Sequence, residues 1–123
     1  MFTLAQIDEI HDSLGKADSL PAYLRALNAI GVRTSDSYLT DGHTDHHGVD
    51  GHTVSTPPAH ETYEVAPTAD PGRVAEALQI SDYFEMSKAL AACGVEKWTF
   101  DTTALTLTYY DKAGNQLLQE ALG

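Results

Sequence analysis

The chain lacks the features that would cross-link it or hold it in a membrane. Its 123 residues contain a single cysteine, Cys93, so no disulfide can form within it, as is usual in a reducing cytoplasm. No apolar run approaches the roughly 20 residues needed to span a bilayer, and no charged and then apolar leader opens the chain. These absences predict a cytoplasmic protein without a membrane segment.

Basic residues are scarce as well. Seven lysines and arginines stand against 18 aspartates and glutamates, and the formal net charge is −11. Such a surface repels nucleic acid and anionic lipid, so we expect neither as a partner. The length and an apolar share of 42% fit one ordinary globular domain, residues 1–123.

The first half of the chain has the pattern of two helices followed by strands. Thr3 and Gln6 are spaced as a capping box at the start of the first helix. A second helix is expected to begin near Asp18 or Ser19 and to end at Gly31, in the left-handed conformation that glycine adopts easily. The strands expected after it are 32–39, 44–47, 52–55 and a weakly alternating edge strand at 61–65.

The second half repeats this order. Asp70, followed by a proline, is a typical helix start, and a second helix is expected from Ser81 or Asp82 to Gly94. The strands expected after it are 95–101, 104–111 and 116–121.

A shift of 63 residues aligns the two halves. Identical residues then coincide, among them Gly31-Val32 with Gly94-Val95. The same elements follow one another at the same spacing, which predicts an α+β domain made of two ααβββ-like halves, about 1–65 and 66–123. We expect an antiparallel sheet packed against the helices.

Four histidines fall within ten positions, between residues 43 and 52, and aspartates alternate with them. Imidazole and carboxylate are ligands that suit divalent transition metals such as zinc, nickel or iron. If 48–51 is a four-residue hairpin loop, His47 lies opposite His52 and Asp45 shares their face, because side chains alternate along a strand. Asp45, His47 and His52 are therefore the candidate metal ligands.

The next histidine along the strand is predicted to face the other way. His46 aligns with Tyr109, in a run of alternating apolar residues that should cover the core, so we expect a buried imidazole with a hydrogen-bond partner. The aligned aromatic residue also predicts that His46→Phe is tolerated. Trp98 and Phe100 are expected in the same core, and Cys93 is expected as a small buried residue.

A catalytic histidine and a purely structural hairpin are the alternatives to a metal site. The chain has no His-Glu-x-x-His motif and no paired cysteines, and a structural zinc site normally needs four ligands. His43 is the candidate catalytic base, since Asp41 or Asp45 would orient its ring. A polar hairpin tip that happens to contain histidines remains the simplest interpretation.

An ordered set of short motifs resembles one known family. It is a group of small bacterial and phage proteins called domain of unknown function 1398, sometimes labelled phage envelope protein, within a YdfO-like superfamily. The resemblance implies an α+β fold and a cytoplasmic, phage-derived protein, and it implies no activity. The motifs are Phe2-Thr3 with Gln6-Ile7, Gly31-Val32, Asp41-Gly42-His43-Thr44, the Gly48 to Gly51 turn, Gly94 to Trp98, and Tyr109 to Gly114.

Three classes of function stay open. The first is a small acidic binding or interaction module that engages another protein or a small-molecule ligand, and that forms a homodimer through a sheet edge or a helix face. The second is a metal-dependent or histidine-based enzyme that uses the His43–His52 hairpin. The third is an acidic decoy for a nucleic-acid-binding protein, suggested by the net charge of −11.

Overall fold

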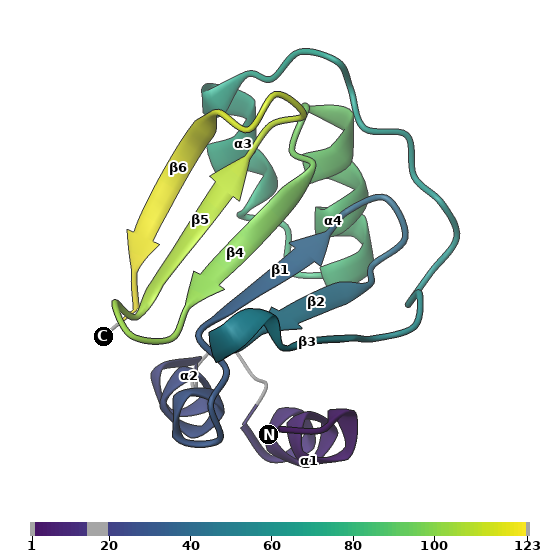
Figure 1. Ribbon diagram of the computed structural model, residues 1–123. Coiled ribbons are helices and arrows are strands. Elements are labelled where there is room, and N and C mark those ends of the chain that lie inside the picture. Colours follow the sequence, from purple (N-terminus) through teal and green to yellow (C-terminus); the bar gives the residue numbers. More distant parts are fainter. Residues whose placement is uncertain (1, 15–19, 123) are drawn as a thin grey trace.

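The computed structural model describes residues 2–14 and 20–122 and has an α+β fold (Figure 1). One antiparallel sheet of six strands, in the order β3-β2-β1-β4-β5-β6, runs through both halves of the chain. The elements are α1 (Leu4–Leu14), α2 (Leu20–Ala29), β1 (Thr34–Tyr38), β2 (Thr44–His47), β3 (Thr53–Ser55), α3 (Pro71–Ala77), α4 (Tyr83–Ala92), β4 (Lys97–Asp101), β5 (Thr106–Tyr110) and β6 (Gln116–Ala121).

The two halves have the same element order and nearly the same spacing. Helices α2 and α4 are 63 residues apart at both ends, and so are strands β1 and β4. Cross-strand neighbours follow the same offset: Ser35 pairs with His46 in the first half, and Trp98 pairs with Tyr109 in the second. The halves join through the antiparallel pair of β1 and β4 at the centre of the sheet.

The helix boundaries lie where the capping residues predict them. The Thr3 backbone N–H donates to Gln6 Oε1 (2.9 Å), and the Gln6 backbone N–H donates to Thr3 Oγ1 (3.3 Å), which confirms the capping box. Asp70 and Asp82 accept hydrogen bonds from the first turns of α3 and α4. The start expected for the second helix, at Asp18 or Ser19, lies outside the described residues.

One expected strand is wrong. Residues 61–65 pair with no strand and instead form part of the extended connection between β3 and α3. The reason is that Val65, only 2% exposed, is buried among the residues of the α3–α4 core. The following Ala66 N–H donates to the carbonyl of Ala91 at the end of α4 (3.0 Å), so the segment packs on a helix rather than on the sheet edge.

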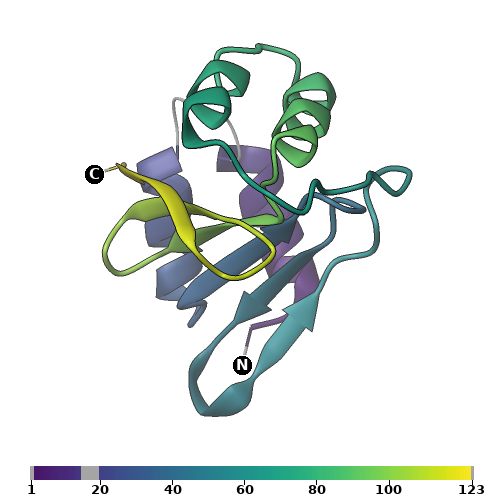
Figure 2. The same cartoon turned by 90° about the horizontal axis from the view of Figure 1, so that it is seen from above.

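The helices of the described residues all cover one face of the sheet, here called the inner face, and none of them covers the other, outer face. Figure 2 shows α3 and α4 on one side of the strands. Leu107 and Tyr109 of the inner face belong to their core, and Val54, on the same face, packs against the core of α1 and α2. The buried Trp98 and Cys93 confirm two of the predicted core positions.

Each helix pair builds its own core on this shared face. The α1–α2 core and the α3–α4 core are separate clusters of buried side chains, and Phe100 lies partly buried against both. Among the described residues, no helix is both long enough and apolar enough to cross a membrane. The two separate cores leave room between the helix pairs, and that space forms the cleft described below.

Candidate functional site

The histidines of the β2–β3 hairpin are divided between different surfaces. Strand alternation puts His47 and Asp45 on the outer face and His46 on the inner face, as predicted. His43 lies just before β2 and packs its ring on Tyr38, with ring centroids 4.6 Å apart. His52 lies at the far end of the hairpin, where its Nε2 is 2.9 Å from the carbonyl oxygen of Phe2.

The expected pairing of His47 with His52 is wrong by one residue. His47 pairs with Thr53, because the hairpin tip is a three-residue turn over Val49–Gly51, in which Asp50 has a left-handed φ of 57°, and the Gly48 N–H donates to the carbonyl of His52 (2.7 Å). A three-residue tip shifts the register relative to the four-residue loop that the sequence suggested. The candidate metal ligands Asp45, His47 and His52 therefore do not converge.

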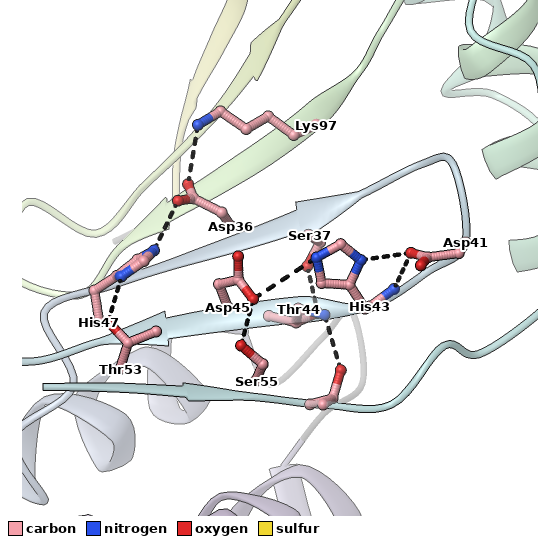
Figure 3. Close-up of polar contacts among 11 residues, drawn as sticks. Asp36, Ser37, Asp41, His43, Thr44, Asp45, His47, Thr53, Ser55 and Lys97 are labelled. Carbon is pink, nitrogen blue, oxygen red and sulfur yellow. Dashed lines mark hydrogen bonds and ion pairs between the residues drawn. The ribbon is translucent and has the colours of Figure 1, made fainter.

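On the outer face, the carboxylate of Asp36 contacts several polar groups (Figure 3). Its carboxylate lies 3.0 Å from His47 Nε2 and 3.6 Å from Lys97 Nζ, and it accepts a hydrogen bond from Thr99 Oγ1 (2.5 Å). The other ring nitrogen of His47 is 3.1 Å from Thr53 Oγ1. Both nitrogens of His47 are thus engaged within the protein.

His43 is oriented by the residues that the sequence suggested. Its Nδ1 lies 2.5 Å from Asp41 Oδ1, and its Nε2 lies 3.7 Å from Asp45 Oδ1 (Figure 3). The backbone N–H of His43 also donates to Asp41, and this bond, followed by the ring contact, holds the pKa of the Asp41 carboxyl below its usual range. The arrangement lies on an open surface, and a catalytic role for His43 stays a prediction.

The described residues contain no group of three or more histidine, cysteine or acidic side chains placed to hold a metal ion. The thiol of Cys93 is buried next to the carbonyl of Leu90, and burial raises its pKa. The hydrogen-bonding groups around Asp36 and His43 on this surface are therefore already paired with one another.

A concave feature lies on the inner face, between the two helix pairs, and we call it the cleft. It encloses about 660 Å³ and is lined mainly by apolar and aromatic side chains. Helices α1 and α2 form one wall, the end of α3 and α4 form the other, and the sheet forms the floor. The lining includes Asp8, Tyr23, His46, Met86, Trp98 and Glu120.

His46 is the buried polar residue in the floor of the cleft. It is 3% exposed, and its Nδ1 lies 2.7 Å from the hydroxyl of Ser35, which is itself buried. Burial lowers the pKa of His46 to about 4, so the imidazole is neutral near pH 7. Within the described part of the chain its Nε2 forms no hydrogen bond, and the residue is part of the lining of the cleft.

The remaining polar groups of the cleft include hydroxyls, the imidazole of His11 and two acidic side chains. Burial raises the pKa of Tyr23 to about 12 and raises the pKa of Tyr109 as well, so both hydroxyls stay protonated. Asp8 on α1 and Glu120 on β6 are exposed residues of the lining. An apolar space with a few neutral hydrogen-bonding groups is typical of a small-molecule site.

Comparison with known proteins identifies the family of this chain but assigns it no activity. The family model for proteins of unknown function designated DUF1398 matches residues 8–121. No curated protein matches the chain. The match confirms the family that the short motifs resemble, while the phage-envelope and YdfO-like descriptions, the phage-derived origin and the cytoplasmic location stay predictions.

Proposed function

The chain belongs to the DUF1398 family of proteins of unknown function, so we propose a function from the geometry of the cleft: the protein is a binding module for a small, largely apolar molecule. The observation that carries this proposal is the position of His46 in the floor of the cleft. Its Nδ1 is paired with Ser35, whereas its Nε2 forms no hydrogen bond with the described residues, so a ligand in the cleft could bind that nitrogen.

The size and lining of the cleft indicate the class of ligand. A volume of about 660 Å³ falls within the range that holds drug-sized molecules. Trp98, Tyr23 and Phe100 offer aromatic surface, so an aromatic or alicyclic body fits best. The neutral imidazole suits an uncharged hydroxyl, amide or carbonyl group, and the exposed carboxylates of Asp8 and Glu120 disfavour an anionic ligand.

Titration with 2-naphthol, followed by ¹⁵N–¹H correlation spectra, tests the proposal. The probe has an apolar body and one hydroxyl, and Trp98, the single tryptophan, supplies a single indole N–H signal in the floor of the cleft. We expect saturable shifts of this signal and of the inner-face residues. Shifts that do not saturate, or that appear only on the outer face, would contradict a binding cleft.

Adjacent histidines on opposite faces provide matched variants. His46→Phe removes the free Nε2, and we expect it to weaken 2-naphthol binding about tenfold, the scale of one lost hydrogen bond. His47→Phe changes the outer face alone and should leave the affinity unchanged. Met86→Trp, which fills the cleft from α4, should abolish binding even if the His46 variant is poorly folded. Equal affinities in all three proteins would refute the proposal.

A further inference from the structure

The connection from β3 to α3 fills a groove beside α4. The groove lies between the β1–β2 turn and the end of α4, and residues 63–70 cross it with three backbone hydrogen bonds. The N–H groups of Tyr63, Ala66 and Asp70 donate to the carbonyls of Thr40 (2.6 Å), Ala91 (3.0 Å) and Cys93 (3.3 Å). Buried Val65 anchors the segment between these bonds.

A groove lies at the equivalent place beside α2. At an offset of 63 residues, the equivalents of Thr40, Ala91 and Cys93 are Thr103 in the β4–β5 turn and Asn28 and Ile30 at the end of α2. Figure 1 shows this turn next to α2. This groove contains a pocket of about 550 Å³, here called the arginine pocket. Its lining residues are Arg25, Asn28, Arg33, Thr102, Thr103 and Leu105.

Within the described residues, no chain segment crosses the arginine pocket as residues 63–70 cross the other groove. The carbonyls of Ile30 and Thr103 accept no backbone hydrogen bond from those residues. The carbonyl of Asn28 accepts, besides the helix-end bond from Gly31, a 3.5 Å contact from the Arg33 guanidinium, at the limit of a hydrogen bond. Backbone carbonyls that accept hydrogen bonds from residues 63–70 in one groove therefore have equivalents, in the other groove, that accept no such bond from the described residues.

The arginine pocket differs from its filled counterpart in charge. Arg25 and Arg33 are two of the three arginines in a chain with a net charge of −11. Within residues 2–14 and 20–122, neither guanidinium lies within 4 Å of a carboxylate. Apolar Leu39 and Ala91 of the filled groove are replaced here by Thr102 and Asn28, whose side chains are hydrogen-bonded to each other (3.1 Å). The pocket therefore suits a polar, negatively charged occupant.

We infer that the arginine pocket docks an extended acidic segment of a partner protein. The segment donates backbone N–H groups to the carbonyls of Thr103 and Ile30, as residues 63–70 do in the other half, and its carboxylates pair with Arg25 and Arg33. The side chain of Leu105 stands where Gly42 leaves space for Ala59 and His60, so the partner engages only the part of the groove equivalent to residues 63–70. This inference does not depend on the cleft.

A synthetic peptide with the sequence of residues 61–70, capped at both ends, is the probe. It has the sequence that fills the equivalent groove, and it carries Glu61 and Glu64. At about 0.15 M salt, where charges more than about 8 Å apart are screened, the net charge of the protein opposes binding little. We expect saturable shifts of the backbone amides of residues 28–33 and 102–105 in ¹⁵N–¹H correlation spectra.

Charge variants of both partners test the contacts. The double variant Arg25→Gln/Arg33→Gln should weaken peptide binding about tenfold or more, and a peptide with Glu61→Gln and Glu64→Gln should weaken similarly. Arg73→Gln, which changes the third arginine, on α3, should leave the affinity unchanged.

Three results would overturn the inference. The first is an unchanged affinity of the Arg25→Gln/Arg33→Gln variant for the peptide. The second is a set of peptide-induced shifts confined to the groove around Thr40 and Ala91. Such shifts would mean that the peptide only displaces the protein's own β3–α3 connection. The third is inorganic phosphate that shifts the same amides with equal affinity, which would identify a general anion site. None of these results bears on 2-naphthol binding in the cleft.

Discussion

The chemistry of this protein depends on a few polar side chains whose surroundings differ sharply. His46 and His47 are neighbours in sequence, yet one is buried against Ser35 and the other is paired with Asp36 on the open face. Strand alternation and the alignment with Tyr109 predict which of the two points inward. They do not identify Ser35 as the partner, because that contact depends on the pairing register of β1 with β2.

Stability should depend on the charge of His46. Its pKa is lowered from 6.5 to about 4 by burial, so the unfolded chain binds a proton first as the pH falls. The stabilisation is complete above about pH 6.5 and is lost as the pH falls toward 4, by up to about 3 kcal/mol. Urea unfolding between pH 7 and pH 4 measures this loss, and His46→Phe should remove that part of the slope. An identical slope in the variant would contradict a buried neutral imidazole.

The hydrogen bond to Ser35 changes what is expected of His46→Phe. The alignment with Tyr109 alone predicts tolerance, but the substitution leaves the buried Ser35 hydroxyl without its partner, which costs about 1–3 kcal/mol. The double variant Ser35→Ala/His46→Phe should recover most of that stability at pH 7. Urea unfolding of the two proteins measures the difference, and a double variant no more stable than the single one would contradict this explanation.

At the scale of elements, the helix ends and turns follow local sequence signals closely. The capping residues and the glycines at the helix ends lie where the sequence predicts them, because these signals act within a few residues. The predicted length of the hairpin loop is wrong by one residue, since loops of three and of four residues both suit the sequence of the tip. That single residue moves His52 away from the position opposite His47 on which the candidate metal site depended.

Two equivalent glycines should differ in their tolerance of alanine. Gly31 and Gly94 both have left-handed φ angles, of 103° and 99°, so each alanine substitution costs about 1 kcal/mol in backbone strain. A Cβ at Gly94 would also lie 2.5 Å from the carbonyl oxygen of Thr68, whereas at Gly31 the nearest atom is on Phe2, 3.8 Å away. Thermal unfolding should show Gly94→Ala as clearly the more destabilising. Equal losses would mean that residues 68–69 do not pack over Gly94.

At the scale of the whole molecule, the order of elements could be predicted and the space between them could not. Repetition at an offset of 63 predicts an α+β fold with helices on an antiparallel sheet, and the structure has that class of fold. The cleft and the arginine pocket involve residues from both halves, so no local pattern reveals them. The sequence indicates these two spaces only indirectly. The indication is that residues 63 positions apart, such as Ser35 and Trp98, differ in chemistry although they occupy equivalent places in the fold.

The shared sheet should make the two cores unfold together. Leu27 and Leu90 are fully buried, one in each core, and replacing either with alanine should cost about 2–5 kcal/mol. Because β1 and β4 join the halves, Leu27→Ala should lower the unfolding midpoint of Trp98 fluorescence as much as that of the circular dichroism signal. Trp98 fluorescence that keeps its original midpoint would mean that the halves unfold separately.

The central claim, a ligand cleft over the inner face of the sheet, is tested most directly by a crystal structure of the protein soaked with 6-bromo-2-naphthol. Anomalous scattering from bromine locates the probe without reference to any assumed position. We predict one strong peak between α2 and α4, above Trp98, with the probe's hydroxyl within hydrogen-bonding distance of His46 Nε2. Side chains that close the space between the helix pairs, or bromine bound only elsewhere on the protein, would contradict the account.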